Sequence, residues 1–486
     1  TTAIQQSSFH YECIFGDQVG LRLRKVNQLM KQIFILLTLT STLILGACSS
    51  DESALPPEAT GKGSIRMINA IKASPEVALL IQESTIGVAD YRSTTVLSTY
   101  DDLDYVFSFE VIYAGSVGKV RFASQPLKMV LKTEYTMLLS GTLDSPAVTI
   151  WETPERGFGA AETIFEARFA HTAESRGNLD FYFAAPGVAP AIGQAVGTLA
   201  FGEILPSVDF EAGDYVLTLT EADLPGSVVF ESGTTPFLLG TQSTIASFDG
   251  GANTSAPMIV KTYTRSGSSV SEAAILDINF PSMSEFVHAS LAMNSVDIYN
   301  EEITATSLPL VSGHNFKDIT NEVALPVGDN PFIYVPTGLI APELLNFVVN
   351  DDGGGRARTL AVGLDAAFLV STYLPDRRPV DTAAKLQIYN SNTNFGAVDI
   401  YIVDADTLID EQFPKIYGVP TATPTGAALL PAGSYDIYLT EPSEKEVLAG
   451  PIRLNANLGD VFGGIIYDMV DPALLEFVLI TESQNP

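Results

Sequence analysis

Three stretches of the chain repeat the same polar residues at the same spacing, and these residue types can do chemistry together. In each stretch a histidine or asparagine stands nine residues before an aspartate, and a tyrosine stands two residues after that aspartate. The sets are His171, Asp180 and Tyr182; His288, Asp297 and Tyr299; and Asn390, Asp399 and Tyr401. An imidazole or amide can hydrogen-bond a carboxylate, and a carboxylate beside a phenol can hold a polar ligand. The sets are therefore the first candidates for a binding site.

Two interpretations of the sets remain open, a ligand-contact patch and a structural pair. In Val296-Asp297-Ile298-Tyr299, strand geometry turns Val and Ile toward the core and Asp and Tyr toward the opposite face, where they could contact a ligand. If each set forms a hairpin, His288 and Asp297 would instead pair across it and hold its register, contributing roughly 0.2–1 kcal/mol. We favour the structural pair, because a fourth, weaker copy at 65–82 has Asn69 and Ala78 in these places.

The signatures of common catalytic sites are absent from the sequence. It contains no Gly-x-Ser-x-Gly, no His-Glu-x-x-His, no Cys-x-x-Cys and no phosphate loop ending in Gly-Lys-Ser or Gly-Lys-Thr. Beyond Met30 the histidines are His171, His288 and His314, and the first two occupy equivalent places in different repeats, which argues against a shared metal site or triad. The sequence predicts no catalytic residue, no cofactor and no enzyme.

One acidic stretch, DADTLIDE at 404–411, offers weak candidates for calcium in Asp404, Asp406 and Asp410. Calcium takes several oxygen ligands, and a loop of this kind could supply some of them. The stretch does not have the spacing of glycine and terminal glutamate found in a helix-loop-helix calcium site. We therefore favour a solvated hairpin tip and predict no metal.

Repeated elements must position the polar sets. The aligned residues Asn69, His171, His288 and Asn390 are separated by 102, 117 and 102 residues. A second phrase follows the first in the repeats, for example EAGDYVLTLTE and PAGSYDIYLTE, and it reads as a turn followed by a period-two strand. Short alternating strands in units of about 100 residues predict an all-β fold of four tandem immunoglobulin-like antiparallel β-sandwich modules.

The expected module ranges follow from the repeats and from the Pro-, Gly- and Ser-rich seams between them. One such seam is RSGSSVSE at 265–272. The modules are expected at 64–155, 162–265, 273–375 and 383–484.

The stretch before the repeats reads as an export signal, MKQIFILLTLTSTLILGACSS at 30–50. A lysine precedes an apolar run that is shorter than the roughly 20 residues of a membrane-spanning helix. The ending Leu45-Gly46-Ala47-Cys48 resembles the bacterial lipobox, which implies cleavage before Cys48 and acyl chains on its thiol and its new amine. More than one acyl chain would attach the protein stably to a membrane.

The segments around this signal can be assigned in the same way. We expect 30–47 to be a lipoprotein signal peptide and 48–63 to be a linker. Residues 1–29 contain no Met, and we interpret them as an upstream extension of the reading frame. Ser49, rather than Asp, follows Cys48, and by resemblance to enterobacterial lipoproteins this implies delivery to the outer membrane.

The net charge limits the kinds of partner that the protein can bind, and the cysteine content limits its disulfides. The net charge of −31 would repel phosphate backbones, which excludes nucleic acid as a partner. The acidic residues are scattered rather than blocked, so we read the charge as solubility outside the cytosol. The two cysteines, Cys13 and Cys48, lie outside the expected modules, which therefore hold no internal disulfide.

The repeated phrases resemble the bacterial domain-of-unknown-function family 4397, whose members are often exported and anchored by lipid. The family phrase is an apolar residue, His-Ala-Ser-Pro, a polar bend and Val-Asp-Val-Tyr, and VHAS with VDIY in the third unit match it best. The Pro after the Ser is present only as Pro75, in the first unit. The resemblance covers residues 64–484 as tandem units and brings no established activity.

The sequence thus predicts a non-catalytic, lipid-anchored protein of the bacterial cell envelope, attached through Cys48 and delivered to the outer membrane. Its tandem modules would bind a partner or play a structural part, and weak repeated contacts would gain strength through multivalency. The candidate partners are an envelope protein and a glycan. The alternative is a carbohydrate- or other ligand-binding envelope protein that acts through one specialised module. The chain has one Trp, Trp151, and many Phe and Tyr. We expect these aromatic side chains to fill the module cores rather than to form platforms for sugars.

Overall fold

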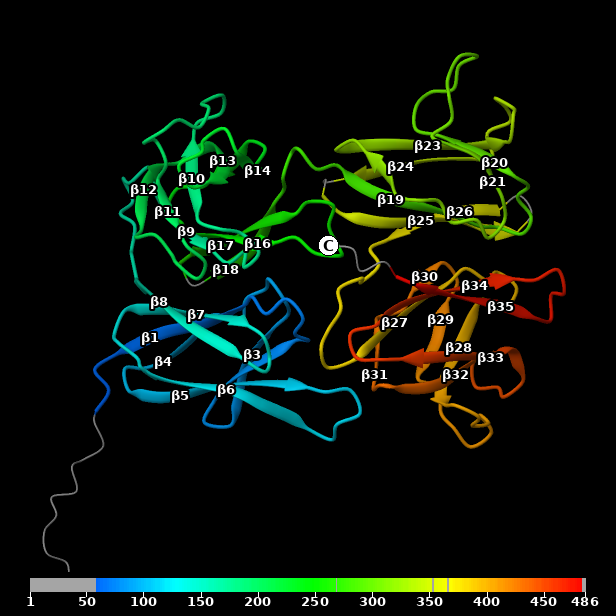
Figure 1. Ribbon diagram of the computed structural model, residues 1–486, viewed down its shortest axis with the longest axis horizontal. Helices are drawn as coiled ribbons and strands as arrows, with labels where there is room; N and C mark the ends of the chain where they lie inside the picture. Colours follow the sequence, from blue (N-terminus) through cyan, green and yellow to red (C-terminus); the bar gives the residue numbers. More distant parts are fainter. Residues whose placement is uncertain (1–57, 268, 352–353, 365–366, 483–486) are drawn as a thin grey trace, which may run out of the picture. The chain divides into compact units, whose positions relative to one another are not determined.

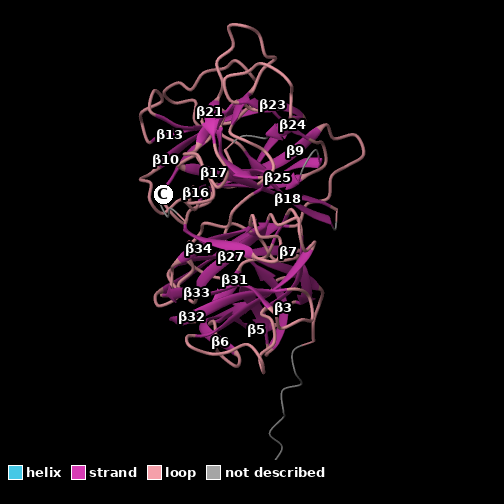
Figure 2. Ribbon diagram, turned by 90° about the vertical axis from the view of Figure 1, so that its right-hand side faces the viewer, coloured by secondary structure: helices cyan, strands magenta, loops and turns pink. Residues whose placement is uncertain are grey.

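The computed structural model describes residues 58–267, 269–351, 354–364 and 367–482. In these ranges the chain forms strands, turns and loops and no helix (Figure 2). It follows that no membrane-crossing helix is found among the described residues. From Thr60 onward the chain belongs to one compact unit. The expected signal peptide at 30–47 and Cys48 lie outside the described residues.

The described strands form eight sheets, which pair into four β-sandwiches with the same topology. We call these sandwiches modules 1 to 4 in chain order. In each module, the first sheet contains the module's first strand, and the second sheet contains the next strand along the chain. Figure 1 shows the two layers clearly in module 3, where β20, β23 and β24 form one layer and β19, β25 and β26 the other. The all-β, multi-module sandwich fold expected from the sequence is confirmed.

Module 1 has the first sheet in the order β4-β1-β7-β8 and the second in the order β3-β2-β5-β6. Its strands are β1 (Lys62–Asn69), β2 (Val77–Ile81), β3 (Ser84–Ala89), β4 (Ser98–Asp101), β5 (Asp104–Ile112), β6 (Lys119–Lys128), β7 (Thr133–Gly141) and β8 (Pro146–Pro154).

Module 2 has the first sheet in the order β12-β9-β16-β17-β18 and the second in the order β11-β10-β13-β14, with β15 paired to β13. Its strands are β9 (Ile164–His171), β10 (Leu179–Ala184), β11 (Gly197–Leu199), β12 (Val208–Glu211), β13 (Gly213–Glu221), β14 (Val228–Glu231), β15 (Thr235–Phe237), β16 (Gln242–Asp249), β17 (Met258–Ser266) and β18 (Ser269–Ile275).

Module 3 has the first sheet in the order β22-β19-β25-β26 and the second in the order β21-β20-β23-β24. Its strands are β19 (Ser282–Ala289), β20 (Val296–Tyr299), β21 (Val311–His314), β22 (Val323–Leu325), β23 (Gly328–Pro336), β24 (Leu345–Asp351), β25 (Arg356–Leu364) and β26 (Ala367–Tyr373).

Module 4 has the first sheet in the order β30-β27-β34-β35, with β31 paired to β27, and the second in the order β29-β28-β32-β33. Its strands are β27 (Ala384–Asn390), β28 (Ala397–Asp404), β29 (Ile416–Pro420), β30 (Thr423–Pro424), β31 (Ala428–Leu430), β32 (Gly433–Thr440), β33 (Val447–Ala456), β34 (Val461–Asp468) and β35 (Leu475–Thr481). Residues 374–383, between β26 and β27, are called the connector below.

Each module fills its own interior with apolar side chains from both of its sheets. In module 3, Val296 and Ile298 of β20 pack with Phe286 of β19 and Phe332 of β23 in one core cluster. Tyr299 belongs to a different cluster. The period-two alternation of the Val-Asp-Ile-Tyr strand therefore divides its side chains between two faces, as the sequence predicts.

Two expectations about the modules are corrected by the strand pairing. The sheets are not purely antiparallel, because the first strand of each module runs parallel to a later one: β1 with β7, β9 with β16, β19 with β25, and β27 with β34. The expected seam at 265–272 is also wrong. Arg265 and Ser266 end β17 and pair with Val270 and Ser269 of β18, so module 2 continues beyond 265 to Ile275.

Candidate functional site

The aspartates of the repeated sets are buried and are fully engaged by their own modules. Asp297 accepts hydrogen bonds from the Ser312 hydroxyl at 3.0 Å and the Gly313 amide at 2.7 Å on one oxygen. Its other oxygen accepts from the Gly338 amide at 2.8 Å. Asp297 thus ties strand β21 to the turn that follows β23, and its carboxylate has little capacity left for a ligand.

The other two aspartates make the same kind of connection. Asp180 accepts from the Thr198 hydroxyl and, at 2.8 Å, from the Asp223 amide. Asp399 accepts from the amides of Gly418 and Ser443 at 2.6 and 3.1 Å. All three carboxylates are at most 5% exposed, so each one links an edge strand to a distant turn. The hydrogen bonds of these aspartates hold together the loops and strands of their own modules.

The expected pairing of histidine with aspartate is wrong. The strands that carry them belong to different sheets, as with β9 and β10, and cannot form the proposed hairpin. Instead His171 Nε2 lies 2.9 Å from the Gly177 carbonyl, and His288 Nε2 lies 3.0 Å from the Asn294 carbonyl. Asn390 donates to the Val419 carbonyl at 2.8 Å. The position anchors neighbouring backbone instead of pinning strand register.

The histidines are held neutral by their surroundings. Burial lowers the pKa of His171 and of His288, and it is the main cause that lowers the pKa of His314 to about 4. The rings of His288 and His314 lie 5.9 Å apart, a neighbour pair that the sequence did not predict. The ring nitrogens His288 Nδ1 and His314 Nε2 are buried without a hydrogen-bond partner. Neither imidazole forms a hydrogen bond to a carboxylate that could activate it.

The tyrosines of the sets lie on the expected face but are covered. Tyr182, Tyr299 and Tyr401 are at most 5% exposed. Tyr401 packs in a cluster with Ile409 and Tyr438, and the Lys445 ammonium lies 4.6 Å from the centre of its ring. Loops therefore fill the face on which a repeated ligand patch would have to stand.

The calcium candidates are not brought together. Asp406 forms an ion pair with Arg453 at 2.7 Å. Among the described residues there is no group of three or more His, Cys, Asp or Glu placed to hold a metal ion. The acidic stretch at 404–411 is therefore the end of β28 and the loop after it, with its aspartates exposed to solvent and one of them paired with an arginine.

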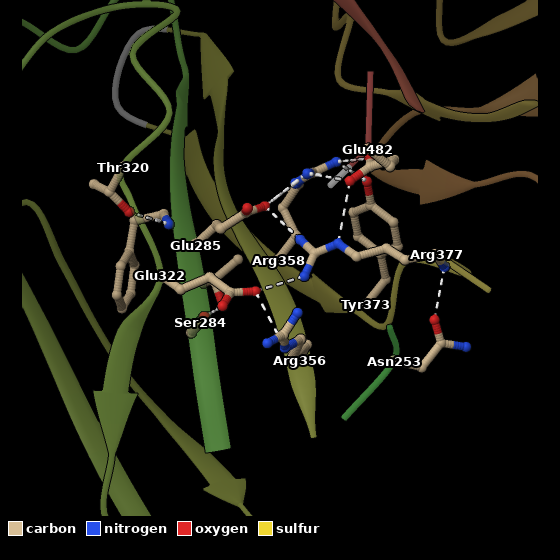
Figure 3. A network of polar contacts seen from close by, with 12 residues as sticks. Asn253, Ser284, Glu285, Thr320, Glu322, Arg356, Arg358, Tyr373, Arg377 and Glu482 are labelled. Carbon is tan, nitrogen blue, oxygen red and sulfur yellow. Dashed lines mark hydrogen bonds and ion pairs between the residues drawn. The ribbon is translucent and has the colours of Figure 1, made fainter. Parts of the chain in front are cut away.

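A buried network of arginines and glutamates is the largest polar site that sequence reasoning missed (Figure 3). Arg358 of β25 and Arg377 of the connector are 1% and 2% exposed. Both guanidinium groups bind Glu285 of β19, at 2.6 and 2.7 Å, and both bind Glu482, which follows β35. Arg377 also binds Glu322 at 2.7 Å.

The charges of this network balance. Two guanidinium groups face the carboxylates of Glu285 and Glu482, while the outlying Glu322 has Arg356 at 3.6 Å in addition. Burial lowers the pKa of Arg358, but the nearby Tyr373, Glu482 and Glu285 outweigh burial and hold this pKa above its ordinary value. A cluster in which each buried cation faces carboxylates satisfies the rule that buried charges are paired. Since Glu285 is in module 3 and Glu482 ends module 4, the cluster joins the two modules.

A second network of arginines and glutamates joins modules 1 and 2, at the junction between them. Glu134 of β7 binds Arg66 of β1 at 3.0 Å and Arg265 of β17 at 3.2 Å. Arg168 of β9 donates to the Glu152 carbonyl of module 1 at 3.0 Å. The remaining cavity here has a volume of about 10 Å³, which is too small for a ligand. This network, too, is a connection between modules and not a binding site.

Apolar side chains complete both junctions. Between modules 1 and 2, Leu138 and Trp151 pack with Ala246, Phe248 and Tyr263 in one buried cluster. Between modules 3 and 4, a corresponding cluster contains Val287, Leu360, Tyr389, Ile465 and Tyr467. In both pairs the contact is made by the outer faces of the first sheets. The modules are therefore packed against each other in pairs.

No family model matches the chain, and no curated protein matches it. Among solved structures, the chain is similar to the Bacillus anthracis TIE protein, with 10% sequence identity and a TM-score of 0.14 over 84% of this chain and 69% of that one. Folds related at this TM-score share little common geometry, so the likeness carries no functional inference.

Proposed function

We propose that the protein is a non-catalytic component of the bacterial cell envelope that presents four packed β-sandwich modules as one unit. The observation that carries this proposal is the identity of the partners that the buried polar side chains bind. The repeated aspartates and histidines bind the backbone of their own modules, and the buried arginines bind glutamates across module junctions. Side chains that are engaged in this way supply rigidity rather than a nucleophile or a general base.

The second part of the proposal is attachment of the protein to the membrane through acyl chains on Cys48, with delivery to the outer membrane. It rests on the lipobox-like stretch before Cys48 and on the resemblance to family 4397, whose members are often anchored in this way. A lipid anchor would hold the modules at the membrane surface, where an envelope protein is the partner that suits a rigid, acidic unit.

Metabolic labelling tests the anchor. The chain expressed from Met30 in a bacterial host should incorporate labelled palmitate and sediment with outer membranes. Cys48→Ala should abolish the labelling and release the protein, because the thiol that accepts the lipid is gone. Ser49→Ala is the matched control and should still be labelled. Labelled, membrane-bound Cys48→Ala protein would contradict the proposal.

The structural role is tested by cross-linking in the native membrane. The anchored protein should be recovered with an envelope protein and should not be retained on polysaccharide columns. Turnover of a defined substrate by the purified protein would overturn the non-catalytic role.

One observation favours the alternative, a ligand-binding protein that acts through a single module. In module 4, Phe413 of the loop after β28 and Tyr417 of the edge strand β29 are 82% and 64% exposed, and exposed rings of this kind can stack on sugars. Trp151 cannot serve this purpose, because it is 4% exposed at the junction of modules 1 and 2. If the alternative holds, retention on a polysaccharide column is lost in Phe413→Ala with Tyr417→Ala and kept in Phe201→Ala.

A further inference from the structure

A cavity of about 240 Å³ lies where module 1, module 2 and the connector meet. Three segments line it: Lys72 from the loop after β1, Tyr91 and Arg92 from the loop after β3, and residues 250–253 from the loop between β16 and β17. The connector closes it with Arg378. Four parts of the chain that are distant in sequence thus converge on one hollow.

The cavity is positively charged in a strongly acidic protein. Three of its lining residues are cations, Lys72, Arg92 and Arg378, and no aspartate or glutamate lines it. The chain as a whole has a net charge of −31. Outside the cavity wall, Arg378 binds Asp90 at 2.5 Å, and the Asp90 side chain is 61% exposed. A concentration of cations against the overall charge creates a local potential that attracts anions.

Arg92 is the residue that most needs a partner. Its Nη1 is buried and has no hydrogen-bond partner, and Arg92 forms no ion pair among the described residues. Burial, the main cause, lowers the pKa of Arg92. Arg92 is partly buried, and a guanidinium nitrogen shielded from water without an anion is costly, whereas the buried arginines of the network in Figure 3 all face glutamates. An oxyanion in the cavity would provide the missing acceptor.

Tyr91 holds the two guanidinium groups in place. The Cζ atoms of Arg92 and Arg378 lie 4.9 and 5.7 Å from the centre of its ring, within the range of cation–π attraction. The Tyr91 ring is itself fixed edge-on against Phe248. Burial raises the pKa of Tyr91 to about 12, so its hydroxyl stays neutral and adds no negative charge to the site.

The walls of the cavity are tied together. Arg378 donates to the carbonyl of Ser74 at 2.5 Å and to that of Lys72 at 3.3 Å. Asn253 accepts from the Arg377 amide at 2.7 Å and donates to Asp376 at 3.2 Å (Figure 3). The site is therefore pre-formed, which lowers the entropy cost of binding a ligand.

We propose that this cavity binds a small organic anion through a carboxylate, sulfate or phosphate group held by Arg92, Lys72 and Arg378. The volume is below the roughly 300–1,000 Å³ of drug-sized sites, so one acidic monosaccharide fits better than a polymer. This binding goes beyond the proposed envelope role and does not depend on lipid at Cys48.

The test is calorimetric titration of the full chain in detergent with glucuronate, glucose 6-sulfate, glucose 6-phosphate, inorganic sulfate and neutral glucose. We expect one or more of the sugar anions to bind, more weakly as salt is raised, and glucose not to bind. Binding of inorganic sulfate alone would show that the site takes a free ion and would overturn the organic ligand. No binding by any anion at millimolar concentration would overturn the site.

Substitution of Arg92 separates a binding role from a structural one. Arg92→Gln should weaken binding of the anion at least tenfold and leave the melting temperature of the free protein unchanged or higher, because a partly buried charge without an anion has been removed. Arg92→Lys keeps the charge and should retain part of the affinity. Arg121→Gln, which changes the net charge equally outside the cavity, should bind as the original does. Unchanged affinity in Arg92→Gln, or a lower melting temperature without ligand, would overturn the proposal.

Discussion

At the scale of single residues, the molecule uses buried polar side chains to hold loops. The carboxylate of Asp297 accepts hydrogen bonds from β21 and from the turn after β23, which are far apart in sequence. Hydrogen bonds to a charged group contribute about 1.5–3 kcal/mol each, more than the roughly 0.2–1 kcal/mol of a cross-strand pair. This difference explains why an aspartate recurs in three modules. Module 1 has Ala78 there and must hold its loops by other means.

The buried histidines make stability depend on pH, and His314 provides the clearest case. Its pKa is lowered to about 4, mainly by burial and further by His288, against the raising influence of Asp318. The unfolded chain, with an ordinary histidine pKa near 6.5, therefore takes up the proton first as the pH falls. Stability should decrease from about pH 6.5 down to about pH 4, by up to about 3 kcal/mol for this residue.

His314→Phe removes the titrating group and should flatten the pH dependence in that window. The measurement is the urea midpoint at pH 7 and at pH 4.5, followed by circular dichroism. The exposed Glu446→Gln should leave the difference between the two pH values unchanged. An equal loss of stability in the original protein and in His314→Phe would contradict the assignment. Carboxyl groups with lowered pKa, such as Asp376 and Asp318, act only at lower pH.

The sequence could predict which residues recur but not what they bind. The set spacing identifies His288, Asp297 and Tyr299 as one repeated group, and strand alternation places Tyr299 opposite the core. The partners of these side chains are backbone groups in loops, and no side-chain type in the sequence marks them. The inference of a hairpin failed because consecutive strands cross to the other sheet, a choice that depends on tertiary packing.

At the scale of elements, the first sheets are apolar on both faces. In β1, Ile65 and Met67 fill the core of module 1, whereas Ile68 packs in the junction with module 2. Apolar side chains on both faces are typical of strands covered on both sides. This pattern, present in the stretch SIRMIN, and the arginine within it were the available signals for a module junction.

The junction of modules 1 and 2 can be tested through Trp151, the only tryptophan of the chain. Ala246 of β16 is fully buried in the same cluster, so Ala246→Asp places a carboxylate between the two first sheets. An unpaired buried charge costs roughly 3 kcal/mol or more, and separation of the modules would relieve it. We expect red-shifted Trp151 emission and stronger acrylamide quenching, with the far-ultraviolet circular dichroism of the sheets retained.

Ser271→Asp adds the same charge to the exposed strand β18 and serves as the control. It should leave Trp151 shielded. If Trp151 also stays shielded in Ala246→Asp, the two sheets do not form the junction described. If the sheets unfold together with the exposure of Trp151, the modules are one cooperative unit rather than packed neighbours.

At the scale of the whole molecule, the connector is a structural element and not a flexible spacer. Its Arg377 binds Glu285 and Glu322 of module 3 and Glu482 at the end of module 4, and its backbone amide binds Asn253 of module 2. Asp381 donates its backbone amide to the Ala73 carbonyl of module 1. One short segment therefore contacts every module, which is consistent with the single compact unit from Thr60 onward.

Loss of Arg377 should loosen this whole assembly. Arg377→Ala leaves the three carboxylates that bind this guanidinium short of a cation, and loss of one partner of a buried ion pair costs about 3–5 kcal/mol. Because the connector holds modules of both pairs, the cost should appear as separation of modules with their cores intact. We expect faster cleavage within 374–383 by a non-specific protease and a larger radius of gyration in solution scattering.

The guanidinium of Arg377 has several N–H donors in a fixed planar arrangement, which a lysine lacks. Arg377→Lys keeps the charge but cannot direct separate donors to Glu482, Glu322 and Glu285, so it should restore little of the protection. Arg356→Gln removes a guanidinium that approaches Glu322 only at 3.6 Å, and it should behave as the original protein. Full protection of the connector in Arg377→Ala would mean that apolar packing between Tyr373 and Tyr389 holds modules 3 and 4 by itself. Loss of protection in Arg356→Gln to the same degree would mean that charge number, and not geometry, holds the connector.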